Sequence, residues 1–330
     1  MKKIAVVILN WNGVKLLEQF LPSVMLYSPE ATIYLADNAS TDSSIEFVKT
    51  NYPDIKIIQN EGNFGYAQGY NVALKYVEEP YFCLLNSDVE VTENWLKPIL
   101  EIFEKEKNIA IIQPKILDFK NKSLFEYAGA AGGFIDKYGY PYCRGRIFET
   151  VEKDNGQYDD FSGIFWASGA CFFIRKEVFN QLGGFDESFF AHQEEIDLCW
   201  RSKNAGYKTY YTFQSIIYHV GGATLKESNP KKTFLNFRNS LLMLVKNLPE
   251  GKILPIIFTR LFLDGIAGIQ FILKGKFSHC WAIIKAHFHF YHLLNKYLKK
   301  RTNNQTESYF KTNSIVYNYF IKGGKVFEEN

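Results

Sequence analysis

The sequence lacks the features that would place it in several large protein classes. Its five cysteines are odd in number and show no CxxC spacing, so they predict reduced thiols, not a disulfide framework or a zinc site. The formal net charge of +3 is too small to favour nucleic acid as a partner. The apolar run at residues 4–9 is too short for a signal peptide, so we expect a cytoplasmic protein.

A dinucleotide-binding fingerprint is also absent. That motif places GxGxxG after the first strand, whereas residues 10–13 contain a single glycine, Gly13. A nicotinamide-dependent dehydrogenase is therefore disfavoured. What the chain does have is 47% hydrophobic residues among 330, enough for a sizeable core in one large or two modest domains.

Four apolar runs in the first 90 residues predict parallel strands, each followed by a polar loop. The runs cover residues 4–9, 32–36, 55–59 and 81–85. Because the carboxyl ends of parallel strands meet at one edge of a sheet, we expect the polar residues that follow them to converge there. These residues are Asn10, Asn12, Asp37, Asn38, Asn60, Asn63, Asn86 and Asp88.

Asp88 closes the stretch Asn86-Ser87-Asp88 at the end of the fourth run. An ionised carboxylate at a strand end is a hard oxygen ligand suited to Mg²⁺ or Mn²⁺ shared with substrate phosphates. The alternative is that these residues make a turn and cap a helix that begins near Glu93.

The loops after the second and third runs suggest contacts to a nucleotide. Asp37 can accept a hydrogen bond from a nucleobase imide or a ribose hydroxyl. Gly62 and Gly65 would let backbone N–H groups at a helix start approach a diphosphate. Glycine and asparagine are also ordinary turn residues, so this loop alone is weak support.

Four stretches in this half resemble the family 2 inverting glycosyltransferases, particularly the bacterial rhamnosyltransferase-like branch: VVILNWNG (6–13), LADNASTDSS (35–44), NEGNFGYAQGYN (60–71) and LLNSDVEV (84–91). The resemblance implies a GT-A fold, an α/β domain with a mixed, mostly parallel sheet flanked by helices and a DxD-type metal motif. By this resemblance, Asp37 occupies the position that binds the nucleobase, and Asp88 occupies the position of the metal-binding acid. Asn86 stands where many relatives have the first Asp of the DxD.

Three carboxylates, Glu194, Glu195 and Asp197, cluster at the start of a predicted helix. The helix dipole alone favours acids there. Alternatively, the bulky apolar neighbours bury a carboxylate and raise its pKa toward that of a useful base. By resemblance, EEIDLCWR (194–201) is similar to the family's ED motif, and Glu195 falls where the catalytic base lies, with Glu194 as the second candidate.

Two further residues gain a role through the same resemblance. His219 ends a predicted apolar strand, where a lone histidine is more often structural or solvated, but in this family a histidine at such a position completes the metal site. Arg238 lies in NFRNSLLML (236–244), which is similar to another family stretch. Its guanidinium could clamp a phosphate or pack on the core.

The chain divides by pattern into a catalytic domain over residues 1–248 and a helical extension over 249–330. Within the domain we expect a nucleotide-sugar-binding half, 1–112, and an acceptor and metal half, 113–248. Residues 113–160 have no sustained period, which indicates a variable insertion with short strands.

The extension begins with an apolar segment, residues 253–273, interrupted by Arg260 and Asp264. Charges at the bilayer centre cost roughly 2.5 to 3.5 kcal/mol each, so we expect this segment to lie on a membrane or in a helical bundle. Residues 277–299 read as a basic amphipathic helix with an aromatic-rich apolar face. We therefore predict that residues 253–301 bind an anionic membrane surface at the inner face of the cell membrane; the alternative is docking on the catalytic domain.

These observations and the resemblance predict a metal-dependent inverting glycosyltransferase. It would move a sugar from a UDP- or dTDP-sugar to a hydroxyl of a saccharide or lipid-linked saccharide, in cell-surface polysaccharide synthesis. Two alternatives remain at this point. One is a nucleotidyltransferase that uses a nucleoside triphosphate, and the other is a non-catalytic, membrane-associated subunit that binds nucleotide sugars.

Overall fold

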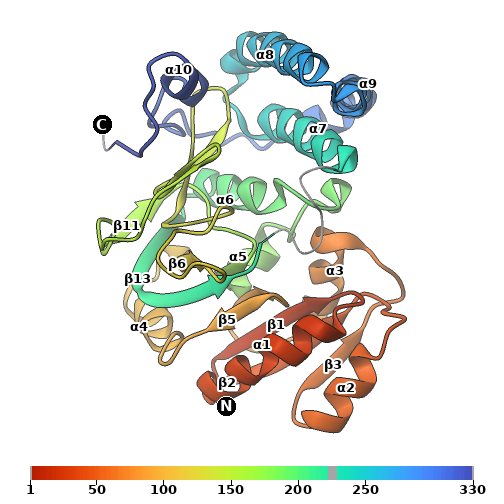
Figure 1. The fold of residues 1–330 in the computed structure, drawn as a ribbon, viewed down its shortest axis with the longest axis vertical. Helices are drawn as coiled ribbons and strands as arrows, with labels where there is room; N and C mark the ends of the chain where they lie inside the picture. The colour runs from red at the N-terminus through yellow and green to blue at the C-terminus, as the bar shows by residue number, and fades with distance from the viewer. Residues whose placement is uncertain (1, 222–228, 329–330) are drawn as a thin grey trace.

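The computed structural model describes residues 2–221 and 229–328. Its centre is a nine-stranded sheet in the order β11-β13-β6-β12-β4-β1-β2-β3, with β5 paired to β13. Figure 1 shows the amino-terminal strands and helices at one end of the molecule and three long carboxyl-terminal helices at the other. The strands of this sheet are β1 (Ile4–Asn10), β2 (Ala31–Asp37), β3 (Lys56–Gln59), β4 (Tyr81–Asn86), β5 (Val89–Val91), β6 (Ile109–Asp118), β11 (Phe161–Ile164), β12 (Cys171–Arg175) and β13 (Lys208–His219).

The first four strands are parallel neighbours, as the sequence predicts. β12 joins them antiparallel to β4, so the whole sheet is mixed. Helices cover both of its faces: α1 (Val14–Tyr27), α2 (Ser44–Asn51), α3 (Gly65–Ala73) followed by a short 3-10 turn η1 (Leu74–Tyr76), α4 (Lys97–Lys105), α5 (Lys176–Gln181), η2 (Glu187–Phe189) and α6 (Glu194–Asn204).

Alternating residues of β1 show why its sequence is apolar throughout. Ile4, Val6 and Ile8 belong to the core that contains α1 and α4, whereas Ala5 and Val7 belong to the core that contains α3 and α6. Both faces of the strand are therefore buried, as is usual for parallel sheets covered by helices.

The structure after Asp88 contradicts the alternative that Asn86-Ser87-Asp88 caps a helix beginning near Glu93. Asn86-Ser87-Asp88 leads through a turn into β5, and the next helix, α4, begins at Lys97 instead of near Glu93. Asp88 therefore does not cap a helix. β5 pairs antiparallel with β13 and sets Val89 opposite His219. This pairing brings two distant segments of the sequence to the same edge of the sheet.

A second, four-stranded antiparallel sheet fills most of the predicted insertion. Its strands are β7 (Gly133–Ile135), β8 (Pro141–Cys143), β9 (Arg146–Ile147) and β10 (Thr150–Val151). The prediction of short strands is confirmed here, although the first residues of 113–160 belong to β6 of the main sheet. The carboxyl-terminal residues return to this small sheet: the Phe327 ring stacks on Phe134 with centroids 5.4 Å apart, and Thr150 Oγ1 lies 2.9 Å from the hydroxyl of Tyr319, in α10 (Ile315–Phe320).

The carboxyl-terminal helices α7 (Pro230–Asn247), α8 (Ile253–Leu273) and α9 (Phe277–Lys299) pack against one another (Figure 1). A short turn, η3 (Glu250–Lys252), precedes α8. Ala282, Ile283, Ala286 and Phe290 are the apolar residues buried along α9. Part of the apolar surface predicted for this helix is therefore docked on the protein.

The two charges within α8 are buried against the rest of the protein. Arg260 donates to the carbonyl of Tyr138 at 2.9 Å, and Asp264 Oδ2 lies 3.2 Å from His287 Nε2 of α9. Arg260 and Asp264 also pair, with Nε and Oδ1 3.6 Å apart. Within the described residues, the segment Glu250–Leu273 is the one helix long and apolar enough to cross a membrane, with a mean hydropathy of 1.7.

A buried ion network joins α6, α7 and the end of α9. Lys246 Nζ lies 3.0 Å from Asp186 Oδ2 and 2.9 Å from Asp197 Oδ2, and Lys300 Nζ lies 2.8 Å from Asp186. Burial alone would raise the pKa of both aspartates, but the lysines and Arg201 outweigh it and hold each pKa below its usual value. The network is therefore ionised at neutral pH.

We expect Lys246→Met to lower the free energy of unfolding by about 3–5 kcal/mol at pH 7, because it leaves two buried carboxylates without their shared cation. The pKa of each aspartate is lowered by folding, so this stabilisation is present above the usual Asp pKa of about 3.9 and is lost as the pH falls through the folded-state values. Urea denaturation followed by circular dichroism at pH 7 and at lower pH measures both effects.

Lys252→Met is the control, since Lys252 pairs with the exposed Glu307. It should cost no more than about 1 kcal/mol. Equal losses in the two variants would show that the buried network is not a major source of stability.

Candidate functional site

The carboxyl ends of β1, β2 and β3 bring four predicted residues together. Asn10 Nδ2 donates to Asp37 Oδ1 at 3.0 Å, and Asn60 Nδ2 donates to Asn38 Oδ1 at 2.7 Å. All four side chains are buried. In the described part of the chain, Asn10 Oδ1 and Asn60 Oδ1 have no hydrogen-bond partner. Buried acceptors of this kind are usually satisfied, so the two oxygens indicate a ligand at this edge.

Three other predicted residues shape the loops around this edge. Asn12 Oδ1 accepts from the backbone N–H of Thr41 at 2.7 Å, and Asn63 Oδ1 accepts from that of Gly65 at 3.1 Å. Gly62 lies one residue before Asn63 in the same loop. The Asn12 and Asn63 side chains thus order the loops on which a ligand would rest.

Trp11 is a residue that the sequence analysis missed. It lies between Asn10 and Asn12, and 52% of it is exposed, which is unusual for so large an apolar side chain. Its ring is free to stack on a planar ligand group. The signal in the sequence that could have identified Trp11 is its position in the polar loop after the first strand.

Asp88 and His219 form a second buried cluster beside Asn86. His219 Nε2 lies 3.1 Å from Asp88 Oδ1 and 3.4 Å from Asn86 Nδ2. On the other side of the ring, His219 Nδ1 lies 3.2 Å from Glu126 Oε1. Burial by itself lowers the pKa of His219, but Glu126 and Asp88 outweigh it and raise that pKa to about 10.

This donor set fits Mg²⁺ or Mn²⁺ held jointly by the protein and a substrate. Asp88 supplies one oxygen, and His219 supplies one nitrogen at the same point once a metal ion displaces the Nε2 proton. Glu126 can orient the ring from behind, as carboxylates beside metal-bound histidines commonly do. Across residues 2–221 and 229–328, no group of three or more His, Cys, Asp or Glu is arranged to hold a metal. The remaining ligands would therefore come from substrate phosphates and water.

The backbone before α6 is held in an unusual conformation. Phe190, His192 and Gln193 have φ of 64°, 70° and 74°, in the left-handed region that favours glycine. Asn239 Nδ2 donates to the carbonyls of Phe189, Ala191 and His192, and Asn239 belongs to α7. Such strain persists where the surrounding structure fixes it and is concentrated at functional sites.

Arg238 hydrogen-bonds to the same loop. Its contacts therefore do not support the prediction that it clamps a phosphate. Its Nη2 donates to the carbonyl of Ser188 at 2.9 Å, and its Nε donates to Asn239 Oδ1 at 2.9 Å. The side chain is half-buried. The packing alternative is closer to the structure, although the contacts are polar.

Four buried polar atoms at the start of α6 have no hydrogen-bond partner among the described residues: His192 Nε2, Gln193 Oε1, Glu194 Oε2 and Glu195 Oε2. Burial raises the pKa of Glu195 to about 7. Burial and the neighbouring Glu195 raise the pKa of Glu194 well above its usual value, and burial lowers that of His192 to about 4. The groups at the start of α6 are thus neutral or weakly acidic, and Glu195 among them can exchange a proton near pH 7.

Asp197 differs from its two neighbours, and its assignment to the catalytic group is corrected here. Its Oδ2 pairs with Arg201 and Lys246, and its Oδ1 accepts from Asn247 at 2.8 Å. The side chain is fully buried. Both oxygens are therefore engaged in joining α6 to α7.

Tyr66 lies between the loop before α6 and residues 169–170, which pair with the end of β4. The backbone N–H of Tyr66, at the start of α3, donates to the carbonyl of Phe190 at 2.9 Å, and the Tyr66 hydroxyl donates to that of Gly169 at 2.9 Å. The next residue, Ala170, accepts from the backbone N–H of Asn86 at 3.0 Å. A short chain of contacts thus connects the loop before α6 with the end of β4.

Comparisons with known proteins agree with this geometry. A family model described as glycosyl transferase family 2 matches residues 5–183, more than half of the chain. The N-acetylglucosaminyl-diphospho-decaprenol L-rhamnosyltransferase of Mycobacterium tuberculosis is 25% identical over 220 residues, which are 62% of this chain and 71% of that protein.

Solved structures share the fold. GalNAc-T7, crystallised with UDP, GalNAc and Mn²⁺, superposes with a TM-score of 0.60 at 18% identity, over 76% of this chain and 49% of that chain. Staphylococcus aureus TarS 1-349, in complex with UDP-GlcNAc, gives a TM-score of 0.55 at 16% identity, over 91% of this chain and 84% of that chain. The predicted GT-A fold is confirmed.

We expect Asp88→Ala to remove metal-dependent binding of a nucleoside diphosphate, because Asp88 is the carboxylate that lies 3.1 Å from His219 Nε2. Calorimetry with UDP and with dTDP, in Mn²⁺ or in EDTA, measures the effect. The affinity of the variant in Mn²⁺ should fall by about tenfold or more, to the level of the wild type in EDTA.

Ser87→Ala, in the same turn, should bind like the wild type and serves as the control. If the wild type binds both diphosphates equally with Mn²⁺ and with EDTA, then Asp88 and His219 do not hold a metal for the donor.

Proposed function

Because the chain belongs to glycosyl transferase family 2, we propose that it is an inverting, metal-dependent enzyme that transfers a hexosyl unit, such as rhamnose, from a nucleoside-diphosphate sugar to a saccharide hydroxyl. The observation that carries the proposal is the junction just described. The loop before α6, which precedes Glu195 with its pKa of about 7, is connected by hydrogen bonds through Tyr66 and residues 169–170 to the end of β4, beside Asp88 and His219.

The relatives support the class of substrate. The mycobacterial relative is named for transfer to a diphospho-decaprenol saccharide, and both solved structures carry a UDP or UDP-sugar. We therefore propose a UDP- or dTDP-sugar donor and a saccharide or lipid-linked saccharide acceptor, in the synthesis of a cell-surface polysaccharide.

The donor would lie along the carboxyl ends of β1 to β4. Asp37, with Asn10 and Asn60 beside it, would hold the nucleoside through the open acceptors at this edge, and Trp11 would stack on its base. Asp88 and His219 would hold Mg²⁺ or Mn²⁺, which supplies positive charge to the departing diphosphate. The loop around Gly62 and the start of α3 would present backbone N–H groups to the same phosphates.

Glu195 would act as the base. It removes the proton from the acceptor hydroxyl while that oxygen forms a bond to the anomeric carbon and the bond to the diphosphate breaks on the opposite side. One displacement inverts the configuration. Glu194, with its pKa raised further, stays protonated, so the two carboxyl groups can divide the roles of base and hydrogen-bond donor.

The helices α8 and α9 would bind the protein to the inner face of the cell membrane. Both helices expose apolar residues, and α9 also exposes Lys285, Lys296 and Lys299, while the charges of α8 are buried against the rest of the protein. This arrangement favours a helix that lies in the membrane surface. The exposed apolar residues are Leu254, Phe258, Phe262, Ile266, Ile269, Ile272 and Leu273 on α8, and Phe277, Trp281, Ile284, Phe288, Tyr291 and Leu298 on α9.

We expect Glu195→Gln to reduce transfer by about 10² to 10⁴ while donor binding is preserved, because the amide cannot accept the proton. In the wild type, kcat/KM should rise with pH and level off above about 7, where Glu195 is ionised. A transfer assay over a pH series, paired with calorimetry of donor binding, tests both statements.

Glu187→Gln, on the exposed turn before the loop, is the matched control and should leave transfer unchanged. Transfer at nearly the wild-type rate in Glu195→Gln, or its loss in Glu194→Gln alone, would remove Glu195 from the role of base.

We expect the double variant Phe258→Asp with Phe262→Asp to bind anionic liposomes at least about tenfold more weakly, since a buried Phe contributes roughly 1.5–3 kcal/mol. These residues are 78% and 66% exposed, so the fold should be kept. Liposome sedimentation measures binding. Leu26→Asp, at a residue 68% exposed on α1, is the control; an equal loss there, or none in the double variant, would contradict the assignment of this surface.

A further inference from the structure

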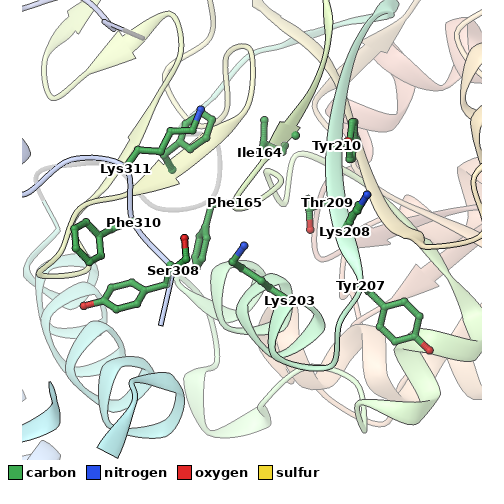
Figure 2. Close-up of a pocket in the computed structure, with 13 residues that line it drawn as sticks. Ile164, Phe165, Lys203, Tyr207, Lys208, Thr209, Tyr210, Ser308, Phe310 and Lys311 are labelled. Atoms are coloured by element: carbon green, nitrogen blue, oxygen red, sulfur yellow. The ribbon is translucent and has the colours of Figure 1, made fainter. Parts of the chain in front are cut away.

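A cavity of about 300 Å³ lies apart from the proposed catalytic site. Figure 2 shows the residues that line it, which come from the end of α6, the start of β13, strand β11 and the carboxyl-terminal segment 308–311. None of the predicted donor, metal or base residues lines it. Because α6 has 11 residues, its two ends are about 16 Å apart, so the cavity and Glu195 lie at opposite ends of one helix.

The charged residues of the cavity are all cations. Lys203, Lys208 and Lys311 line it, and no carboxylate does. Within the described residues, none of the three has an Asp or Glu oxygen within 4.0 Å, whereas Lys115, Lys246 and Lys300 are all paired. Lys203 is half-buried, and this burial lowers its pKa.

An ammonium group that has lost part of its water without gaining a counter-ion is unfavourable. In Figure 2, Lys203 extends from the end of α6 toward Ser308 and Phe165, and Lys208 lies beside Thr209 at the start of β13. An anion bound in the cavity would offset the cost of partly burying Lys203, and the exposed Lys208 lines the same cavity as a second cation.

Aromatic side chains form much of the remaining wall, including Phe165, Tyr207, Tyr210 and Phe310. Tyr210 is supported by Phe161, with ring centroids 4.6 Å apart, and Lys311 Nζ lies 4.6 Å from the centroid of Phe134. A concave surface that combines aromatic rings with a few polar groups is typical of ligand sites, and the flat faces of rings suit the C–H faces of a sugar.

We propose that this cavity is a second binding site, which holds a carboxylate- or phosphate-bearing saccharide through Lys203 and Lys208. That the ligand is a saccharide rests on the proposed function; that it is anionic rests on the lysines. The separation along α6 means that the bound unit is not the one that reacts at Glu195. The site would hold an acceptor chain at a distance from its reacting hydroxyl.

The test is calorimetry of the full chain with four probes: trigalacturonate, maltotriose, a maltotriose phosphate and inorganic phosphate. The variants are Lys203→Gln with Lys208→Gln, and, as control, Lys49→Gln with Lys75→Gln, two exposed lysines of the donor half. We expect at least one anionic saccharide to bind the wild type about tenfold more tightly than maltotriose, and only the Lys203/Lys208 variant to lose this preference. Whether trigalacturonate or the phosphate ester binds more tightly identifies the anionic group.

Three results would overturn the proposal: equal affinity for neutral and anionic saccharides, equal loss in both double variants, or inorganic phosphate binding as tightly as the saccharides. Binding of UDP or dTDP with Mn²⁺, measured on the same samples, separates this test from the proposed function. Loss of the lysines should leave that binding unchanged, and its absence in the wild type would count against the donor site alone.

Discussion

The loop from Phe189 to Gln193 holds a backbone shape that it would not adopt alone, and the catalytic half depends on that shape. Three non-glycine residues there have positive φ, each at a cost of order 1–3 kcal/mol. Asn239 and Arg238 offset this cost with hydrogen bonds to the loop carbonyls. Because both belong to α7, and α7 is fixed in turn by Lys246, the carboxyl-terminal helices support the geometry of the proposed base.

Neighbouring acids on α6 show how environment assigns different tasks to similar groups. Asp197 faces Lys246 and Arg201, which keep it ionised. Glu194 and Glu195 are held away from solvent and pair with no cation among the described residues, so burial raises their pKa values. The three acids lie within about one helical turn, and the distinction comes from Arg201, one turn further along α6, and from Lys246 of α7, 49 residues after Asp197.

The sequence predicted the parallel strands, the converging polar residues and the small strands of the insertion, because these follow from local patterns. It could not predict β5, whose three residues pair with a strand more than 120 residues away, nor Glu126 behind His219, which that pairing brings close. Arg238 was identified, but its contacts depend on how α7 meets the loop. The lysine cavity was missed altogether, since its walls come from four segments that share no motif.

The return of the carboxyl-terminal residues to the small sheet has a consequence for the order in which the protein is made. Asp136 Oδ2 accepts from the backbone N–H of Ile315, 179 residues later. Domains fold largely from the amino terminus as they leave the ribosome. The parallel strands β1 to β4 can therefore form early, while the small sheet, the loop before α6 and the wall formed by residues 308–311 must wait for distant segments. A nascent chain would thus hold these four strands well before the loop from Phe189 to Gln193 is supported.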